Sequence, residues 1–307
     1  CSAPAPAGKW LALVGIGEDG VEGLGSEARR LVSRAEVVFG GRRHLALAAA
    51  LIRGEARPWP SPFDVGGVIA LRGRPVCVLA SGDPFQHGVG ATLARKVSVD
   101  EMAAVPAPSA FSLAAARLGW ALQDVETVSL HGRPMELVRP LLHPGARILA
   151  LTSDGAGPAT VARMVAEAGF GRSRMHVLEA LGGPEERVRC LTAEEMQDVA
   201  CGPLNVAALE VVAGPDAKVL PLAGLEDALF ESDGQITKRE IRAVTLSSLA
   251  PRRGELLWDV GAGSGSIAIE WMLRHPSLRA VAVEERAARA ARIRRNALAL
   301  GAPGLGV

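Results

Sequence analysis

The chain has 307 residues, enough for two domains, and 49% of them are hydrophobic, which suffices to fill real cores. Its 34 Lys and Arg residues nearly balance 33 Asp and Glu residues, so the net charge of +1 gives no support to nucleic-acid binding. No apolar run reaches the roughly 18 residues that a membrane-spanning helix requires, and the four cysteines and six histidines show no metal-site spacing.

We therefore expect a cytoplasmic protein without a metal, a membrane or a nucleic-acid partner. Residues 1–9 are of low complexity and are predicted to be disordered. From Trp10 onward, short apolar runs alternate with amphipathic or Ala-rich stretches, which predicts an α/β protein with mostly parallel sheets. The first strands are expected at 10–16, 36–39, 76–80, 127–130, 147–152, 175–179 and 205–212, with helices at 26–35, 109–118 and 159–168.

The segment Ala213-Gly-Pro-Asp-Ala217 interrupts this alternation and is interpreted as a domain junction. The first domain would then cover 10–213, with lobes of about 10–105 and 106–213, and the second would cover 214–307. In the second domain we expect a helix at 238–249, a strand at 256–260, a helix to about 273, a strand at 279–284 and a basic helix to about 300.

A glycine loop follows the strand expected at 256–260. Gly261, Gly263 and Gly265 allow the backbone to pass close to a ligand. The helix predicted to begin near Ser264 would point its free N–H groups at that ligand. Glu284 ends the next strand about twenty residues later, a position suited to hydrogen bonds with ribose hydroxyls.

The glycine spacing separates two kinds of cofactor. A dinucleotide fingerprint is GxGxxG, whereas this loop is GxGxG, with Ser266 at the place of the last glycine. Asp259-Val-Gly-x-Gly-x-Gly with a downstream Glu resembles motif I and its acidic partner in class I methyltransferases, whose cofactor is S-adenosylmethionine. A class I sheet needs more strands than the two expected here, so the second domain is expected to be incomplete, with apolar surface uncovered. The resemblance implies that the cofactor is bound by Gly261, Ala262, Gly263, Ser264, Gly265 and Glu284.

The first glycine loop, Gly15-Ile-Gly-Glu-Asp-Gly20, does match GxGxxG after a strand, but the signal is weak. Further glycines at 23 and 25 disfavour an immediate helix by about 1 kcal/mol each, so the helix is expected to start at Ser26, acting as its N-cap. The next strand is followed by Arg42-Arg43 and no acid, which would exclude NAD but allow NADP. An NADP-dependent reductase therefore remains an alternative for this half.

Four further loops follow strand ends, where open α/β sheets bind ligands. They are Ala80-Ser-Gly-Asp-Pro-Phe85, Val105-Pro-Ala-Pro-Ser-Ala-Phe-Ser-Leu-Ala114, Leu130-His-Gly-Arg133 and Leu151-Thr-Ser-Asp-Gly-Ala-Gly-Pro158. With the opening glycine loop, they resemble the tetrapyrrole methylase family over about residues 10–212. That family binds S-adenosylmethionine in a cleft between two α/β lobes. The resemblance implies cofactor binding by Gly15, Gly17, Ser81, Gly82, Asp83, Pro84, Ser109, Ala110, His131 and Gly132.

Plain structural roles compete with some of these assignments. Asp83 is also a natural cap for the turn before Pro84, and His131 is also explained as a solvated loop histidine. The family's opening loop usually contains Gly-Pro-Gly-Asp, whereas this chain has Gly17-Glu-Asp-Gly20, which leaves Glu18 without an assigned role.

A tetrapyrrole methylase domain ahead of a class I domain resembles the decarboxylating precorrin methyltransferases of the cobalamin pathway. The segment Ser232-Asp-Gly-Gln-Ile-Thr-Lys-Arg-Glu-Ile-Arg242 resembles the entry segment of that family's second domain, where the residue matching Thr237 contacts the cofactor. The resemblance implies methylation of two meso carbons of a precorrin, one in each domain, with loss of an acetate carboxylate as CO₂ in the second. It also implies a homo-oligomer. No catalytic side chain is assigned, because electron-rich meso carbons need alignment with the methyl donor more than a protein nucleophile.

The substrate carries many carboxylates, which Arg binds bidentately. Candidate anchors are Arg42-Arg43-His44, Lys238-Arg239 with Arg242, and Arg252-Arg253, although short basic runs of this kind are usually solvated surface clusters. The basic helix 286–295 is expected to face solvent. Because the second domain is expected to be incomplete, decarboxylation is predicted to fail in this polypeptide. A non-catalytic corrinoid-binding protein is the remaining alternative.

Overall fold

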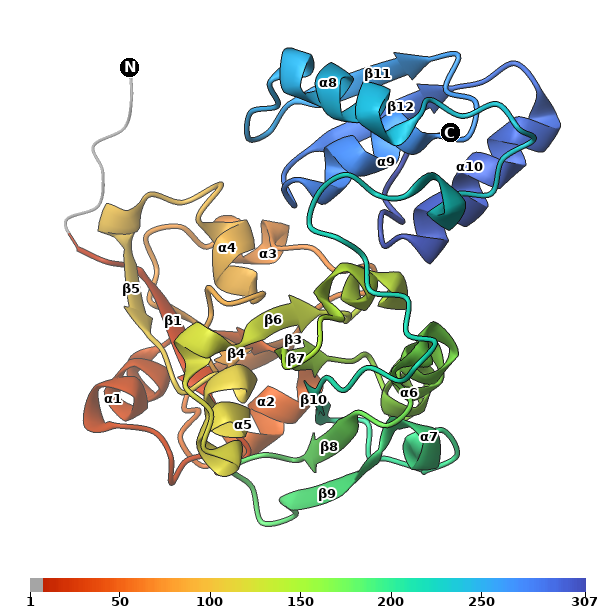
Figure 1. Ribbon diagram of the computed structural model, residues 1–307. Coiled ribbons are helices and arrows are strands. Elements are labelled where there is room, and N and C mark those ends of the chain that lie inside the picture. The colour runs from red at the N-terminus through yellow and green to blue at the C-terminus, as the bar shows by residue number, and fades with distance from the viewer. Residues whose placement is uncertain (1–7) are drawn as a thin grey trace, which may run out of the picture. The chain divides into compact units, whose positions relative to one another are not determined.

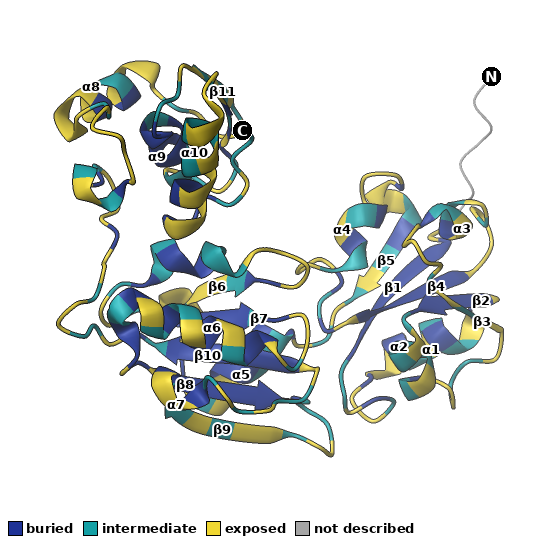
Figure 2. Ribbon diagram, turned by 90° about the vertical axis from the view of Figure 1, so that its right-hand side faces the viewer, coloured by how far each residue is buried: buried dark blue, intermediate teal, exposed yellow. Residues whose placement is uncertain are grey.

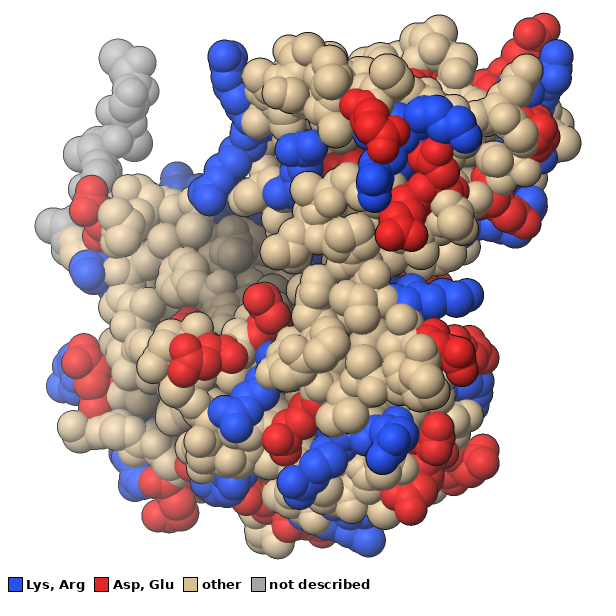
Figure 3. Space-filling view, viewed as in Figure 1, with Lys and Arg blue, Asp and Glu red and all other residues tan. Residues whose placement is uncertain are grey.

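Three β-sheets organise the computed structural model, which describes residues 8–307 (Figure 1). The prediction of disorder covers residues 1–9, and residues 1–7 lie outside the described part of the chain. Among the described residues, every helix is too short or too polar to cross a lipid bilayer. Acidic and basic side chains are interspersed over the face seen in Figure 3, as the balanced composition predicts.

The first sheet is parallel, with the strand order β3-β2-β4-β1-β5. Its strands are β1 (Leu11–Ile16), β2 (Val37–Gly40), β3 (Glu55–Pro58), β4 (Val76–Ser81) and β5 (Met102–Val105). Its helices are α1 (Ser26–Arg34), α2 (Arg42–Leu47), α3 (Gly66–Ile69), α4 (Val89–Leu93) and the short η1 (Val99–Glu101).

Both faces of this sheet are buried, as expected for parallel strands. Side chains alternate along β1, so Leu11 and Leu13 pack into one apolar cluster with α3 and α4. Ala12 and Val14 pack into another with α1. Figure 2 shows β1 and β4 in the buried colour between these helix layers.

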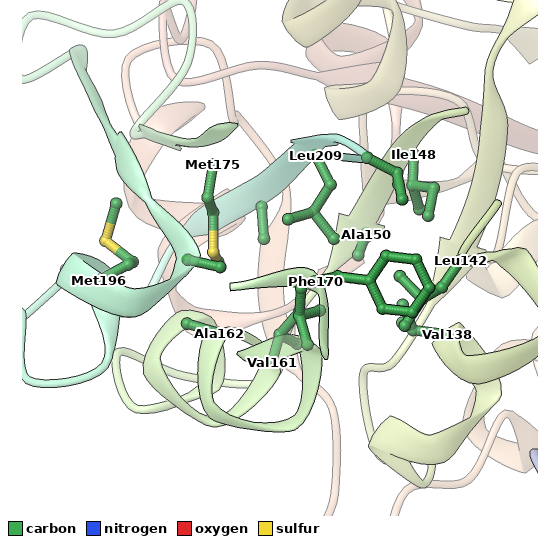
Figure 4. Packing of buried hydrophobic residues seen from close by; sticks show 14 of the residues in the cluster. Val138, Leu142, Ile148, Ala150, Val161, Ala162, Phe170, Met175, Met196 and Leu209 are labelled. Carbon is green, nitrogen blue, oxygen red and sulfur yellow. The ribbon is translucent and has the colours of Figure 1, made fainter. Parts of the chain in front are cut away.

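The second sheet has the order β6-β7-β10-β8-β9. Its strands are β6 (Glu126–Ser129), β7 (Arg147–Leu151), β8 (Arg174–Glu179), β9 (Arg187–Thr192) and β10 (Asn205–Glu210). Between β5 and β10 the chain also forms the helical elements α5 (Ala110–Leu118), η2 (Leu122–Asp124), η3 (Met135–Leu141), α6 (Gly157–Val165), η4 (Ala166–Phe170) and α7 (Ala193–Met196). Figure 4 shows the core beside this sheet, where the fully buried ring of Phe170 lies next to Val138 and Leu142.

The third sheet consists of two parallel strands, β11 (Leu256–Val260) and β12 (Arg279–Val283). The helical elements around it are η5 (Asp227–Leu229), α8 (Arg239–Leu249), α9 (Ser266–Leu273) and α10 (Ala287–Ala299). Helix α9 packs against both strands. Alternate residues of β11 form an apolar face that is largely exposed, with Leu256 at 43%, Trp258 at 64% and Val260 at 76%.

Several helix starts, among them those of α1 and α9, differ from prediction by one or two residues. Ser26 is the first residue of α1, while Gly25 occupies the N-cap without a side-chain bond. Helix α9 begins at Ser266 instead of near Ser264, because Gly265 takes a left-handed conformation (φ +77°) that ends the loop.

Candidate cofactor sites

Several residues that were predicted to bind the cofactor lie close together at the carboxyl end of the first sheet. The backbone N–H of Gly82 donates to the carbonyl of Ile16 (3.1 Å), and that of Ala107 donates to the carbonyl of Gly82 (3.1 Å). A Cβ at Gly15 would overlap the Gly82 carbonyl oxygen and lie 2.5 Å from the Ala107 nitrogen. Glycine at position 15 therefore lets the loops after β1, β4 and β5 approach one another.

Gly82 is required both by conformation and by space. Its φ is +53°, and an added Cβ would lie 2.8 Å from the Pro108 carbonyl oxygen and 2.9 Å from the Cα of Ser109. The Ser109 hydroxyl accepts a bond from the Ser112 N–H (3.1 Å) and so caps α5. Ala110 is the first residue of that helix. Ser109 and Ala110, which were predicted to bind the cofactor, thus form the start of a helix, and the Ser109 hydroxyl is used as the cap of that helix.

The remaining predicted residues of these loops shape turns. Asp83 accepts a bond from the Phe85 N–H (2.8 Å), which is the turn-capping role considered for it. Pro84 is buried, and its carbonyl accepts from Gly90 (2.8 Å). The carbonyl of Gly17 accepts from the Gly20 N–H at 3.1 Å in the tight turn after β1.

Ser81 belongs to a polar cluster that sequence reasoning missed. Arg43 donates to the Ser81 hydroxyl (3.1 Å), and His44 Nε2 lies 2.8 Å from the same oxygen. Arg43 also forms an ion pair with Glu18, which gives that acid a partner. Burial, and secondarily the charge of Arg43, lowers the pKa of His44 to about 4, so this imidazole is neutral at pH 7. The proposed anchor Arg42-Arg43-His44 is therefore largely an internal cluster, with Arg42 exposed.

The loops after β6 and β7 also meet. Gly132 has a φ of +65° and donates its N–H to the Ser153 hydroxyl (2.9 Å). That hydroxyl donates in turn to the Leu130 carbonyl (3.4 Å). The side chain of His131 is exposed, as the solvated-loop alternative predicts. Loops that follow strand ends thus come together in the second sheet as they do in the first.

The second glycine loop is built on left-handed backbone. Gly261, Gly263 and Gly265 have φ values of +77°, +59° and +77°, which side chains with a Cβ rarely adopt. A Cβ on either of the first two would have no atom closer than 4.0 Å, so conformation alone requires glycine there. At Gly265 a Cβ would lie 2.8 Å from Ile293, so this glycine also lets α10 pack on the loop. The N–H of Gly265 closes the turn on the Ala262 carbonyl (2.8 Å).

Glu284 lies beside this loop, as its position in the sequence predicts. Its carboxylate accepts from the Gly263 N–H (2.9 Å) and the Arg286 N–H (3.0 Å). These bonds, the one from Arg286 first, hold its pKa below the ordinary value, so the group is ionised at neutral pH. Each carboxylate oxygen keeps a further lone pair, so Glu284 can still accept bonds from ligand hydroxyls.

Asp259 and Ser264 complete the loop. Asp259 accepts from the Ala268 N–H (3.2 Å), and burial raises the pKa of its carboxyl. Ser264 is 2% exposed, and within residues 8–307 its hydroxyl has no hydrogen-bond partner. A buried, unpaired hydroxyl in a loop of left-handed glycines fits a site for a polar ligand such as S-adenosylmethionine.

Thr237 is held through its backbone. Its carbonyl accepts a bond from Arg242, whose side chain is fully buried. Arg242 also pairs with Glu270 (2.7 Å) and Asp227 (2.6 Å), and donates to the Leu225 carbonyl. The prediction that Arg242 anchors a substrate carboxylate is therefore wrong, because protein groups surround its guanidinium. Within residues 8–307, no hydrogen bond joins Thr237 directly to the glycine loop.

The basic helix is only partly solvent-facing. Arg289 and Arg292 in α10 are 16% and 18% exposed and pair with Asp233 at 2.8 and 3.2 Å. Arg289 also donates to Gln235 (2.6 Å). These bonds, chiefly the one from Arg289, lower the pKa of Asp233 to about 2. The expectation of a solvent-facing helix is wrong for these two arginines, because their partners lie more than fifty residues earlier.

Comparison with known proteins identifies the family. Residues 11–197 match the tetrapyrrole (corrin/porphyrin) methylases, and residues 228–307 match the precorrin methyltransferase domain. A precorrin-6Y C(5,15)-methyltransferase (decarboxylating) from a Sinorhizobium species is 60% identical over 309 residues, covering 100% of this chain and 75% of that protein. The chain belongs to the precorrin-6Y C(5,15)-methyltransferase family.

Two further matches have a narrower extent. A cobalt-precorrin-7 C(5)-methyltransferase from Salmonella typhimurium is 29% identical over 185 residues, covering 59% of this chain and 90% of that protein. The solved structure of a cobalamin-biosynthesis precorrin-6Y methylase from Archaeoglobus fulgidus matches at 27% identity with a TM-score of 0.51, covering 67% of this chain and 100% of that one.

These findings confirm the predicted α/β fold and the prediction of an S-adenosylmethionine-dependent methyltransferase of corrin biosynthesis. The first glycine loop lies inside the matched tetrapyrrole methylase region, so the reductase alternative has no support. Membership of an enzyme family likewise leaves the passive binder without support. Within residues 8–307, no group of three or more His, Cys, Asp and Glu residues is arranged to hold a metal ion.

Proposed function

We propose that residues 10–213 methylate C-5 of a precorrin, and that residues 214–307 bind the cofactor for methylation at C-15 and loss of an acetate carboxylate as CO₂. One observation carries this division. The C(5)-methyltransferase relative aligns with 185 residues of this chain over 90% of its own length. Only about half as many residues follow the proposed junction, so that alignment does not fit within the second domain. The full-length relative is named for both positions, and a separate precorrin methyltransferase domain matches residues 228–307.

Each domain is proposed to hold its own S-adenosylmethionine. In the first, the support is the close approach of Gly15, Gly82 and Ala107, which brings the loops after β1, β4 and β5 together at the edge where a parallel sheet binds ligands. In the second, the support is the left-handed glycine loop with the ionised Glu284 beside it. Cofactor binding by His131, Gly132 and the other residues predicted for the two sites remains a proposal of the same kind.

The chemistry asks the chain mainly for alignment. When bound, the cofactor supplies an activated methyl group on a sulfonium, and the electron-rich meso carbon is the nucleophile. Glu284 would accept hydrogen bonds from the ribose hydroxyls and so fix the orientation of the donor. Such positioning can contribute on the order of 7–11 kcal/mol to lowering the barrier. The exposed clusters Lys238-Arg239 and Arg252-Arg253 remain proposed anchors for substrate carboxylates.

Calorimetric titration of the whole chain with S-adenosylhomocysteine tests the proposal, with NADPH in a parallel run. We expect two binding sites for S-adenosylhomocysteine and none for NADPH. Asp83→Ala should weaken one site and Glu284→Ala the other, while the exposed neighbour Glu285→Ala serves as a matched control and should change neither. Binding of NADPH alone, or a Glu284→Ala variant with both sites intact, would overturn it.

We further propose that this chain acts as a homo-oligomer in the cytoplasm. The similarity to tetrapyrrole methylases supports assembly, and the free state of Cys77, Cys190 and Cys201 fits a reducing compartment. Sedimentation velocity at several protein concentrations tests the oligomer, and a monomer at all of them would contradict it.

A further inference from the structure

We propose that Asn296 is a positioning residue of the second cofactor site, and that it sets the spacing between the glycine loop and the entry segment, defined as residues 231–238. The inference rests on the proposed binding of S-adenosylmethionine by that loop. Asn296 lies in α10, is 3% exposed and is more than thirty residues from either element in the sequence.

The amide of Asn296 bonds both elements at once. Its Oδ1 accepts from the Glu231 N–H (2.8 Å), and its Nδ2 donates to the Glu231 carbonyl (3.0 Å) and to the Ser264 carbonyl (2.9 Å). A carboxamide offers one acceptor oxygen and two N–H donors, so the two contacts made by Nδ2 use both donors. Aspartate has no donor for the two carbonyls, and a shorter side chain does not reach both. The geometry therefore selects asparagine.

Ser264 is in the middle of the glycine loop. Its predecessor Gly263 is held by Glu284, and its successor Gly265 packs against Ile293 of α10. The bond from Asn296 to the Ser264 carbonyl thus adds a third fixed point to a loop whose conformation already depends on left-handed backbone. Any movement of the Asn296 amide would be transmitted to the loop.

Other side chains of α10 hold the same entry segment. Arg289 bonds Asp233 and Gln235, and Arg292 bonds Asp233. Positions 289, 292 and 296 are three and four residues apart in succession, so they share one face of the helix. The face of α10 formed by Arg289, Arg292 and Asn296 therefore holds residues 231–235 of the segment through hydrogen bonds and ion pairs.

The other end of the entry segment is fixed separately. Arg242 binds the Thr237 carbonyl and pairs with Glu270 in α9. Thr237 is consequently placed by a segment anchored at both ends, and Asn296 is the anchor that also touches the glycine loop. A residue in this position acts on cofactor affinity through the spacing of two elements without contacting the cofactor.

The test is S-adenosylhomocysteine titration of the full chain carrying Asn296→Ala or Asn296→Asp. Affinity at the second site should fall about ten-fold, while the first site in the same molecule stays unchanged and serves as an internal control. Leu298→Ala, an exposed position on the same helix, should leave both sites unchanged. Hydrogen exchange of α10 establishes that each variant is folded at the temperature of titration.

A double-mutant cycle with Thr237→Ala separates positioning from mere stability. If Asn296 acts by placing Thr237, the two losses of affinity are not additive. Full additivity, or folded Asn296 variants that keep second-site affinity within about two-fold, would overturn the inference. If Asn296→Ala unfolds the second domain, Arg289→Met takes its place; it should weaken that site about three-fold, and an unchanged affinity would overturn the inference. An unmodified chain with no Glu284-dependent site would instead refute the proposed function.

Discussion

Replacing Arg242 by methionine should strongly destabilise the C-terminal region. The side chain is fully buried, and its removal leaves Glu270, itself 4% exposed, without the cation that it pairs with. The carbonyls of Leu225 and Thr237 lose their donor as well. Breaking a buried ion pair by removing one partner costs about 3–5 kcal/mol. Methionine is chosen because it is flexible and fills irregular apolar space, so cavity formation contributes little.

Urea unfolding read by hydrogen exchange in α8 and α9 measures this loss locally. The double variant Arg242→Met with Glu270→Met should recover much of it, because it no longer buries a lone carboxylate. Asp227 is 29% exposed and is expected to be rehydrated. A loss below about 1 kcal/mol would refute the reasoning. So would an Arg242→Met variant of unchanged stability that no longer binds precorrin, since that result would restore Arg242 as a substrate anchor.

Three further predictions concern the first sheet. Gly15→Ala should cost about 1–3 kcal/mol through overlap with the neighbouring loop and abolish first-site S-adenosylhomocysteine binding by titration, whereas Gly67→Ala, whose added Cβ meets only an ordinary contact at 3.5 Å, should change neither. His44 has its pKa lowered from 6.5 to about 4, so its stabilisation is complete above pH 6.5 and is lost as pH falls toward 4. The loss is on the order of 3 kcal/mol, and urea unfolding should show a flatter acid limb for His44→Gln. Burial raises the pKa of Cys77 to about 12, so iodoacetamide should label the exposed Cys190 in the native chain and leave Cys77 unmodified, as mass spectrometry would show.

Sequence patterns predicted the buried strands well, because their apolar runs have a local cause. β1, β4, β7 and β11 appear within one or two residues of their predicted bounds. Two strands that were not predicted, β3 and β9, lack that signal. β3 carries Glu, Arg and Pro at the exposed edge of its sheet, and β9 is an edge strand with arginines in alternation. The side chains of an edge strand are often exposed to solvent and polar, so hydrophobic periodicity does not reveal such a strand.

The positions of the glycine loops and of Glu284 could be predicted from the sequence. Each directly follows a strand, and the carboxyl ends of parallel strands lie at the same edge of a sheet. The side-chain partners could not be predicted. Arg43 meets Ser81 across 38 residues, and Arg289 meets Asp233 across 56. An arginine that faces water and one that grips a distant segment look alike in a basic helix, since only the tertiary fold supplies the partner. This is why the sequence predicted a solvated helix where α10 holds the entry segment.

The two glycine loops also show that one sequence signal can have two physical causes. Gly15 is needed because two backbones approach it, although its φ is not in the left-handed region. Gly263 has open space around it and is needed for its φ of +59°. Alanine at Gly263 would therefore act through backbone strain of about 1–2 kcal/mol, and alanine at Gly15 through steric overlap. Glycine is selected both where two backbones approach each other and where a ligand binds at the start of a helix, which is why the first loop matched a dinucleotide fingerprint. Only the second loop continues directly into a helix.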